Sequence, residues 1–293
     1  MRIARAVIND EIWVGTVDVD SSRFQCRLRD DASSGKDAAI ELIALTLDGS
    51  PLPPALRQEP LDAARLLSPI RQPSKNVICI GKNYSAHAEE FAGSGYDSSA
   101  GADSETVPSA PILFSKAPSS LVGPRDPVEV PWHVTSEIDY EAELGLVIGR
   151  GGRHIARDDA YDHVWGYTVI NDVTARDLQS RHKQWLLGKS IDTFCPMGPY
   201  IVSADELDPE SLELNCWVNG ELRQQANTKD LVFDIPEILA AVSASMTLQT
   251  GDIVATGTPA GVGIGFSPPR FLRKGDRVRV EISGIGTIEN EIS

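Results

Sequence analysis

The sequence predicts a β-dominated α+β protein in which a small N-terminal β-rich unit precedes a larger domain. Apolar or alternating runs of strand length recur along the 293-residue chain, whereas helical patterns are few and short. A proline-rich stretch at residues 51–54, followed by Pro69 and Pro73, separates the first runs from the rest. We therefore expect one domain at residues 1–70 and a second at residues 75–293.

The N-terminal unit begins with two strand-like runs, Ile3 to Ile8 and Ile12 to Val17. Short apolar runs broken by polar clusters continue to about Leu47, and we interpret the whole stretch as β-rich. A short helix is expected around Leu61 to Leu67.

In the larger domain, strand after strand is predicted. The expected strands are residues 77–80, 112–114, 139–148, 164–171, 198–202, 212–218, 253–256 and 277–282. Asn219-Gly220 lies between alternating runs and predicts a two-residue hairpin turn. Helices are expected at residues 85–91, 174–181 and 235–243, the second with Thr174 as its N-cap.

Composition excludes several classes of function. With 27 Lys plus Arg against 42 Asp plus Glu, the formal net charge is −15, and no basic stripe could neutralise the phosphates of a nucleic acid. No apolar run approaches membrane-spanning length, and the N-terminus lacks a signal-peptide core. Four scattered cysteines without a CxxC pair indicate reduced thiols. We expect a cytoplasmic protein that binds neither nucleic acid nor membrane.

One segment differs in composition from the rest of the chain. Residues 92–109 are mostly Gly, Ser, Ala and Asp with little apolar content, which is typical of a loop. Such a loop is either filler or an active-site lid. Because reactive residues flank it, we favour a flexible lid over about residues 84–109.

Three carboxylates form the first candidate site. Glu141 and Glu143 are two residues apart on a predicted strand and so face the same side, with Cα atoms about 6.5 Å apart. Asp172 follows another predicted strand. A divalent cation would relieve the repulsion within this set. The alternatives are a solvated strand face for the glutamates and helix capping for Asp172.

Two further motifs could contribute to the same site. Lys189 lies in an apolar or small-residue stretch, where it could stabilise an enolate or a substrate carboxylate, or simply extend to solvent. The run TGTPAGVG at residues 256–263 follows a strand. It is weak evidence for phosphate binding and is also explained by a loop that needs positive φ.

The ordered runs DYEAELG, NDVTARD, GKSIDTFCPMGP and TGTPAGVG resemble the catalytic domain of the fumarylacetoacetate hydrolase family over roughly residues 75–293. The resemblance implies a mixed β-sandwich roll, a homodimer, and Mg²⁺ or Mn²⁺ held by two glutamates and an aspartate, with Ca²⁺ as a possible substitute. Transferred by position, the metal ligands are Glu141, Glu143 and Asp172, and the family lysine is Lys189. The implied substrate contacts are Thr258, Arg176 and Gln179.

The resemblance also suggests a general base. Family members that cleave acylpyruvates carry a His and a Glu three residues apart on a lid helix, which matches His87 and Glu90 in NYSAHAEEF. This spacing puts both side chains on one helix face, where the carboxylate can orient the imidazole. By itself, the pair would be a surface i,i+3 contact.

Together these residues suggest a metal-dependent hydrolase that cleaves the C–C bond of a 2,4-dioxo acid, such as an acylpyruvate or a 2,4-dioxo-3-deoxy sugar acid, and releases pyruvate. His87 would activate water, while the cation and Lys189 would stabilise the pyruvate enolate. The same enolate chemistry also fits an oxaloacetate decarboxylase or an isomerase of unsaturated 2-oxo diacids. A non-catalytic cation-binding β-domain is the alternative from another class.

Overall fold

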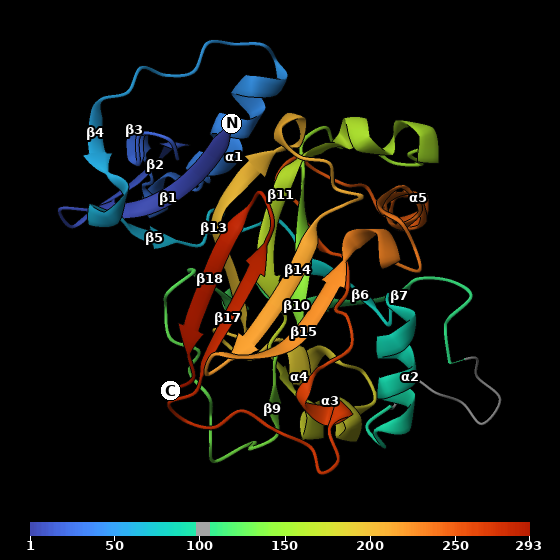
Figure 1. Ribbon diagram of the computed structural model, residues 1–293. Coiled ribbons are helices and arrows are strands. Elements are labelled where there is room, and N and C mark those ends of the chain that lie inside the picture. Colours follow the sequence, from blue (N-terminus) through green and yellow to red (C-terminus); the bar gives the residue numbers. More distant parts are fainter. Residues whose placement is uncertain (98–105) are drawn as a thin grey trace.

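The computed structural model describes residues 1–97 and 106–293, so part of the predicted lid lies outside the described residues. Within this part of the chain, strands dominate, as predicted (Figure 1). Most belong to a 12-stranded mixed sheet. Ten of its strands follow the order β4-β3-β2-β1-β13-β11-β10-β16-β6-β7. Of the other two, β5 pairs with β1, and β8 pairs with β13. A four-stranded sheet has the order β15-β14-β17-β18, and β9 pairs with β12.

The N-terminal unit contains strands and one helix. Its elements are β1 (Arg2–Ile8), β2 (Glu11–Asp18), β3 (Arg23–Arg29), α1 (Ala38–Leu47), β4 (Arg57–Pro60) and β5 (Arg65–Leu67). β1 also pairs with β13, with Ile3 opposite Ile201. The N-terminal strands therefore continue the large sheet (Figure 1). The domain boundary near residue 70 stays a prediction.

Two expectations for this unit were wrong. Helix α1 lies in the stretch interpreted as strands: the Asp37 side chain accepts from the N–H groups of Ala39 and Ile40, and Leu42 and Ile43 are buried on one face. Capping and a helical apolar spacing thus override the strand interpretation. The helix expected around Leu61 to Leu67 is only a 3-10 turn, because the chain then enters β5 and pairs with β1.

The larger domain follows the predicted order closely. Its first half contains β6 (Val77–Gly81), α2 (Ser85–Gly93), β7 (Ile112–Lys116), β8 (Leu121–Val122), β9 (Ile138–Asp139), β10 (Ala142–Ile148), β11 (Val164–Asn171), β12 (Thr174–Ala175), α3 (Arg176–His182) and α4 (Leu186–Lys189). Its second half contains β13 (Cys195–Ser203), β14 (Glu213–Val218), β15 (Glu221–Asn227), α5 (Ile235–Ser245), β16 (Ile253–Ala255), β17 (Arg277–Ile282) and β18 (Gly286–Glu291).

Local details confirm one prediction and correct two. Asn219 and Gly220 have φ angles of 52° and 82° in the β14–β15 turn, as the hairpin prediction required. The strand expected at 139–148 is interrupted before β10, so Glu141 lies just ahead of the regular strand. Thr174 is not an N-cap: it pairs within β12, its hydroxyl donates to the Asp172 carbonyl, and α3 begins at Arg176.

The two sheets pack face to face. Side chains of β10 such as Leu144 and Leu146 share one apolar cluster with Leu214 and Val280 of the four-stranded sheet. Val147, which points the other way, belongs to a second cluster, on the side where α1 covers the sheet. The alternation along β10 therefore directs Glu143 away from the sandwich interior, as the strand spacing predicted.

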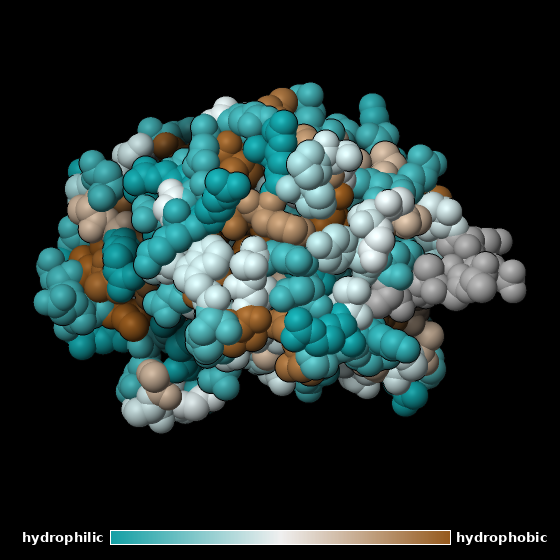
Figure 2. All heavy atoms as spheres, turned by 90° about the horizontal axis from the view of Figure 1, so that it is seen from below, coloured by the Kyte–Doolittle hydropathy of each residue, from teal (hydrophilic) through white to brown (hydrophobic). Residues whose placement is uncertain are grey.

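The surface is mixed in character. Seen from below, it is largely hydrophilic with small, scattered hydrophobic patches (Figure 2). In the described residues, no helix combines the length and the apolar character needed to cross a bilayer. The four cysteines are buried and not joined in disulfides, which agrees with the expectation of reduced thiols.

Candidate metal centre and substrate pocket

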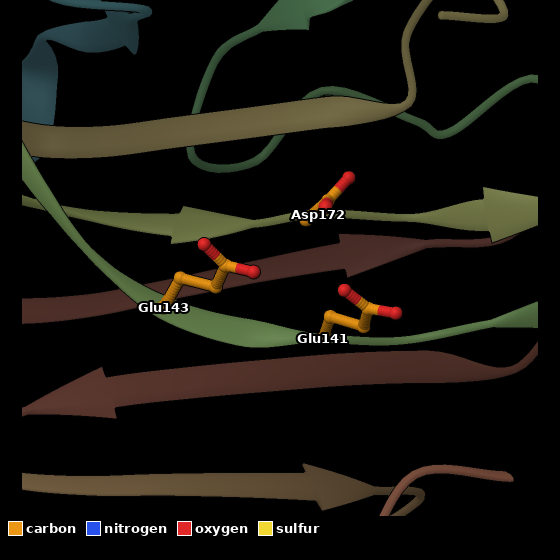
Figure 3. A group of neighbouring side chains, drawn as sticks. All are labelled: Glu141, Glu143 and Asp172. Atoms are coloured by element: carbon orange, nitrogen blue, oxygen red, sulfur yellow. The ribbon is translucent and has the colours of Figure 1, made fainter. Parts of the chain in front are cut away.

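Three carboxylates lie together on adjacent strands. Ala142 of β10 is opposite Asn171 of β11, and the Asp172 N–H donates to the Glu141 carbonyl over 2.8 Å. One carboxylate oxygen from each of Glu141, Glu143 and Asp172 lies within 4.8 Å of the others. Figure 3 shows the two glutamates projecting from one chain segment toward the aspartate of the next.

This donor set fits a hard divalent cation. All three side chains are buried, so the solvated strand face considered for Glu141 and Glu143 does not apply. Burial raises the pKa of Glu143 well above its usual value, and the charges of Asp172 and Glu141 raise it further. A cation with oxygen preference, such as Mg²⁺ or Mn²⁺, would offset that repulsion.

Lys189 lies between two of the carboxylates. Its Nζ is 2.7 Å from Glu141 Oε2 and 2.7 Å from Asp172 Oδ2. Burial lowers the pKa of Lys189, but the two carboxylates outweigh burial and raise it. In the same way burial raises the pKa of Glu141, whereas Lys189 and Arg176 lower it to about 2. Lys189 is therefore a buried cation of the site rather than a side chain extended to solvent.

A second lysine was missed by the sequence analysis. Lys116, at the end of β7, is fully buried, and its Nζ donates to Asp172 Oδ1 over 2.5 Å and to the Val173 carbonyl over 3.0 Å. The available signal was a lysine two residues after the apolar run 112–114, but its partner lies 56 residues away. With Lys189 on the other oxygen, both Asp172 oxygens accept from an ammonium group.

Arg176 contacts the opposite end of Glu141. Its Nη1 is 2.7 Å from Glu141 Oε1 and its Nε is 2.9 Å from Asp139 Oδ2. Asp139, also missed from the sequence, is held by the N–H groups of Gly263 and Ile264. The buried Nη2 of Arg176 has no hydrogen-bond partner among the described residues, so this guanidinium keeps a donor for a ligand carboxylate.

Gln179 lies beside Arg176. Its Oε1 accepts from Arg176 Nη1 over 3.1 Å, one helical turn further along α3. Both side chains are buried and line the same pocket as the carboxylates. The structure therefore brings these two predicted substrate contacts to the site, and their role as contacts stays a prediction.

His87 and Glu90 form a buried pair on α2. His87 Nδ1 is 3.1 Å from Glu90 Oε2, and the other oxygen of Glu90 accepts from the Gly261 N–H over 3.0 Å. Because an ionised Glu90 can only accept, Nδ1 carries the proton and Nε2 is left as the basic nitrogen. The side chains are 6% and 14% exposed, which rules out a solvated surface pair.

The glycine-rich run after β16 forms the remaining wall. Gly257 has a φ of 103°, and its N–H donates to Glu143 Oε2 over 2.9 Å. The Thr258 hydroxyl accepts from Gln224 Nε2 over 2.8 Å. Gln224 was not predicted, because it lies on β15 and only the sandwich packing brings it here. Both the predicted positive φ and the predicted position of Thr258 beside the site are observed.

Many of these groups line one pocket. Its lining combines two of the carboxylates, three cations and the His87 imidazole with aromatic side chains. The lining residues are Ile80, Gly81, Lys82, His87, Phe91, Phe114, Glu141, Glu143, Arg176, Gln179, Trp185, Lys189 and Thr258. The pocket therefore presents charged and aromatic side chains to one space.

Comparison with known families identifies the larger domain. Residues 76–293 match the model of the fumarylacetoacetate (FAA) hydrolase C-terminal domain. The chain belongs to the fumarylacetoacetate hydrolase family. The resemblance proposed from the four ordered motifs is thereby confirmed, and so is the expected fold.

Curated relatives carry the names of tautomerases. Oxaloacetate tautomerase YisK of Bacillus subtilis (strain 168) is 50% identical over 233 residues, covering 79% of this chain and 74% of that protein. The mitochondrial oxaloacetate tautomerase fahd2 of Xenopus laevis is 43% identical over 272 residues, covering 91% and 78%. Because some relatives are mitochondrial, the cytoplasmic location expected for this chain stays a prediction.

Solved structures share the whole fold. Fumarylacetoacetate hydrolase from Exiguobacterium antarcticum is 40% identical with a TM-score of 0.82, covering 100% of this chain and 99% of that chain. Maleylpyruvate hydrolase from Sphingobium sp. SYK-6, in complex with manganese(II) ion and pyruvate, is 34% identical with a TM-score of 0.75, covering 100% and 98%. Relatives of this chain are thus tautomerases, hydrolases and isomerases.

Proposed function

We propose that the protein is a metal-dependent enzyme that interconverts the keto and enol forms of oxaloacetate or a closely similar 2-oxo diacid. The observation that carries this proposal is the buried set Glu141, Glu143 and Asp172, with one carboxylate oxygen of each within 4.8 Å of the others. The two glutamates of this set line one pocket with His87 and Lys189. The substrate class comes from the relative that is named as an oxaloacetate tautomerase and is 50% identical to this chain.

In this proposal each charged group has a separate task. The divalent cation held by the three carboxylates would supply Lewis-acid stabilisation of negative charge at the 2-oxo end. The buried Nη2 of Arg176, which has no partner among the described residues, binds a carboxylate of the substrate. Lys189, fixed 2.7 Å from both Glu141 and Asp172, adds positive charge where the oxygen on C2 gains negative charge.

His87 moves the proton. In the keto-to-enol direction its Nε2 takes a proton from C3, the C–H electron pair becomes the second bond between C2 and C3, and the C2=O π pair moves onto the oxygen. That oxygen then takes a proton from water, and the His87 imidazolium returns its proton to water. Glu90, 3.1 Å from His87 Nδ1, holds the ring in the required tautomer and stabilises the imidazolium that forms. The reverse direction uses the same groups with the proton returned to C3.

Hydrolysis of a 2,4-dioxo acid is the second candidate, and it is the reaction predicted from the sequence. The same His87–Glu90 pair could activate water for attack on C4, and pyruvate would leave as its enolate. The maleylpyruvate hydrolase structure with manganese and pyruvate favours it, at 34% identity. The tautomerase is preferred because that relative has the higher identity to this chain.

Decarboxylation and isomerisation would need no catalytic side chain beyond those already named, since each reaction passes through an enolate. A non-catalytic cation-binding domain is disfavoured, because it would not require a buried imidazole–carboxylate pair and a buried lysine in the cation pocket.

A panel of substrates separates these reactions. The metal-loaded protein would be given the enol form of oxaloacetate, an acylpyruvate and maleylpyruvate, each with and without chelator. The expected result is loss of enol absorbance faster than in protein-free buffer with the same metal ion and without release of pyruvate, and chelator should return the rate to that of the uncatalysed reaction. Release of pyruvate from the dioxo acids at a higher kcat/KM would favour the hydrolase, and no turnover of any 2-oxo acid would refute both enzyme proposals.

A further inference from the structure

Lys82 is a buried cation of the pocket that the proposed reaction does not use. It follows β6, lines the same pocket as His87 and Arg176, and its Nζ is 2.5 Å from Asp97 Oδ2. The two side chains are only 4% and 5% exposed. Its Nζ also lies 5.5 Å from the centre of the Phe91 ring, so aromatic and charged surfaces meet at this end of the pocket.

The backbone holds Lys82 in this position under strain. Its φ is +56°, in the left-handed region that a residue with a Cβ rarely adopts. The next residue, Asn83, is fixed by its side chain, which donates to the carbonyls of Phe233 and Thr256 and accepts from the Phe233 N–H. Strain that the surrounding structure enforces at a pocket indicates that the direction of this side chain matters.

The backbone is equally constrained on the N-terminal side of Lys82, at Gly81. A Cβ added to Gly81 would lie 2.6 Å from the Trp185 ring, so the aromatic wall packs directly on the backbone before Lys82. The lysine therefore cannot be repositioned by a small backbone shift on either side.

The other cations in the pocket contact the metal-site carboxylates, and Arg176 also keeps its Nη2 for one substrate carboxylate. Lys189 contacts Glu141 and Asp172, and Arg176 contacts Glu141. Lys82 differs, because its ion pair within the described residues is with Asp97, which is not part of the carboxylate set. It is thus a positive charge at the pocket that is held apart from the candidate cation site.

We propose that Lys82 binds the distal carboxylate of a 2-oxo diacid, and that Asp97 occupies this position in the absence of substrate. The inference rests on the proposed function in that it assumes a 2-oxo acid held at the carboxylate set. Exchanging one carboxylate for another keeps the buried ammonium paired throughout. Asp97 follows exposed Gly95 and half-buried Tyr96, so it lies close to the protein surface.

The test compares two ligands that differ at one end. Oxaloacetate and 2-oxobutyrate have the same four-carbon chain, but the second carries a methyl group in place of the distal carboxylate. Dissociation constants are measured calorimetrically with the Mg²⁺-loaded protein, which requires no turnover. We expect Lys82→Met to weaken oxaloacetate binding about 10- to 100-fold and 2-oxobutyrate binding less than about twofold, with Lys82→Arg retaining much of the preference for the diacid.

Lys75→Met is the matched control. Lys75 precedes β6, as Lys82 follows it, and forms its own 2.5 Å ion pair with Asp252. This variant should leave both dissociation constants unchanged. Asp97→Asn removes the competing carboxylate, so it should leave oxaloacetate binding unchanged or make it several-fold tighter.

The outcomes separate this inference from the proposed function. Equal weakening of both ligands in Lys82→Met, or loss of oxaloacetate binding in Asp97→Asn, would mean that the pair is structural and would overturn the inference. If the wild-type protein tautomerises oxaloacetate but binds both ligands alike, only the Lys82 inference fails. If it binds the diacid through Lys82 without tautomerising it, only the proposed reaction fails.

Discussion

Metal binding should release a proton from Glu143. The pKa of this carboxyl is raised well above its usual value by burial and by the charges of Asp172 and Glu141, so without metal it holds a proton at pH values where a normal glutamate does not. A cation binds the ionised form and must displace that proton. Affinity therefore rises with pH, by about tenfold per unit while Glu143 remains protonated, and levels off above its pKa.

Calorimetry in buffers of different ionisation enthalpy measures this proton directly. At pH values above the ordinary range of a glutamate and below the raised pKa of Glu143, we expect up to one proton released per Mg²⁺ or Mn²⁺ bound. The variant Glu143→Gln carries no titrating proton and should bind more weakly with no pH slope. Glu141→Gln is the matched control: the pKa of Glu141 is already lowered to about 2, so its loss should weaken binding while the slope remains.

The same linkage has a consequence for folding stability. A carboxyl whose pKa is raised in the folded state costs stability as pH rises through that pKa. As pH rises from the ordinary glutamate pKa of about 4.3 to the raised pKa of Glu143, the metal-free protein should therefore lose more stability than the metal-loaded protein does. If metal affinity in Glu143→Gln rises with pH as steeply as in the wild type, the released proton does not come from Glu143.

Three more predictions concern the ligands and the base. Asp172→Ala should abolish metal-dependent turnover while circular dichroism shows a retained fold, and an active variant with tightly bound metal would contradict the ligand assignment. His87→Ala should lower kcat about 10²- to 10⁴-fold with metal affinity unchanged by calorimetry, so a wild-type rate would exclude His87 as the base. A Cβ on Gly265 would overlap the Glu90 carboxylate, at 1.7 Å from Oε1. Gly265→Ala should therefore displace that flexible side chain and lower kcat to the same extent as Glu90→Gln should, with a melting temperature near that of the wild type; full activity of Gly265→Ala would argue against an orienting role for Glu90.

The sequence predicted the parts of the site that depend on local spacing. The two-residue interval between Glu141 and Glu143 requires a shared face on an extended chain, and the i,i+3 interval between His87 and Glu90 requires a shared face on a helix. Both arrangements are present in the structure. Their functional roles stay predictions.

Residues that reach the site through long-range packing could not be predicted. Lys116 contacts Asp172 across 56 residues, and Gln224 contacts Thr258 across 34, and neither pairing leaves a periodic signal. Helix α1 was missed for a different reason. Its capping residue Asp37 and its apolar spacing were present in the sequence, but neighbouring alternating runs favoured strands there.

The central claim is that the carboxylate set and His87 together promote proton removal from C3 of a 2-oxo acid. Nuclear magnetic resonance in D₂O measures this removal directly, as deuterium exchange at C3 of 2-oxobutyrate or oxaloacetate above the rate with metal ion alone. The account predicts exchange that requires Mg²⁺ or Mn²⁺, is abolished by chelator, and is lost in His87→Ala. Exchange at the background rate with metal-loaded wild-type protein would contradict it.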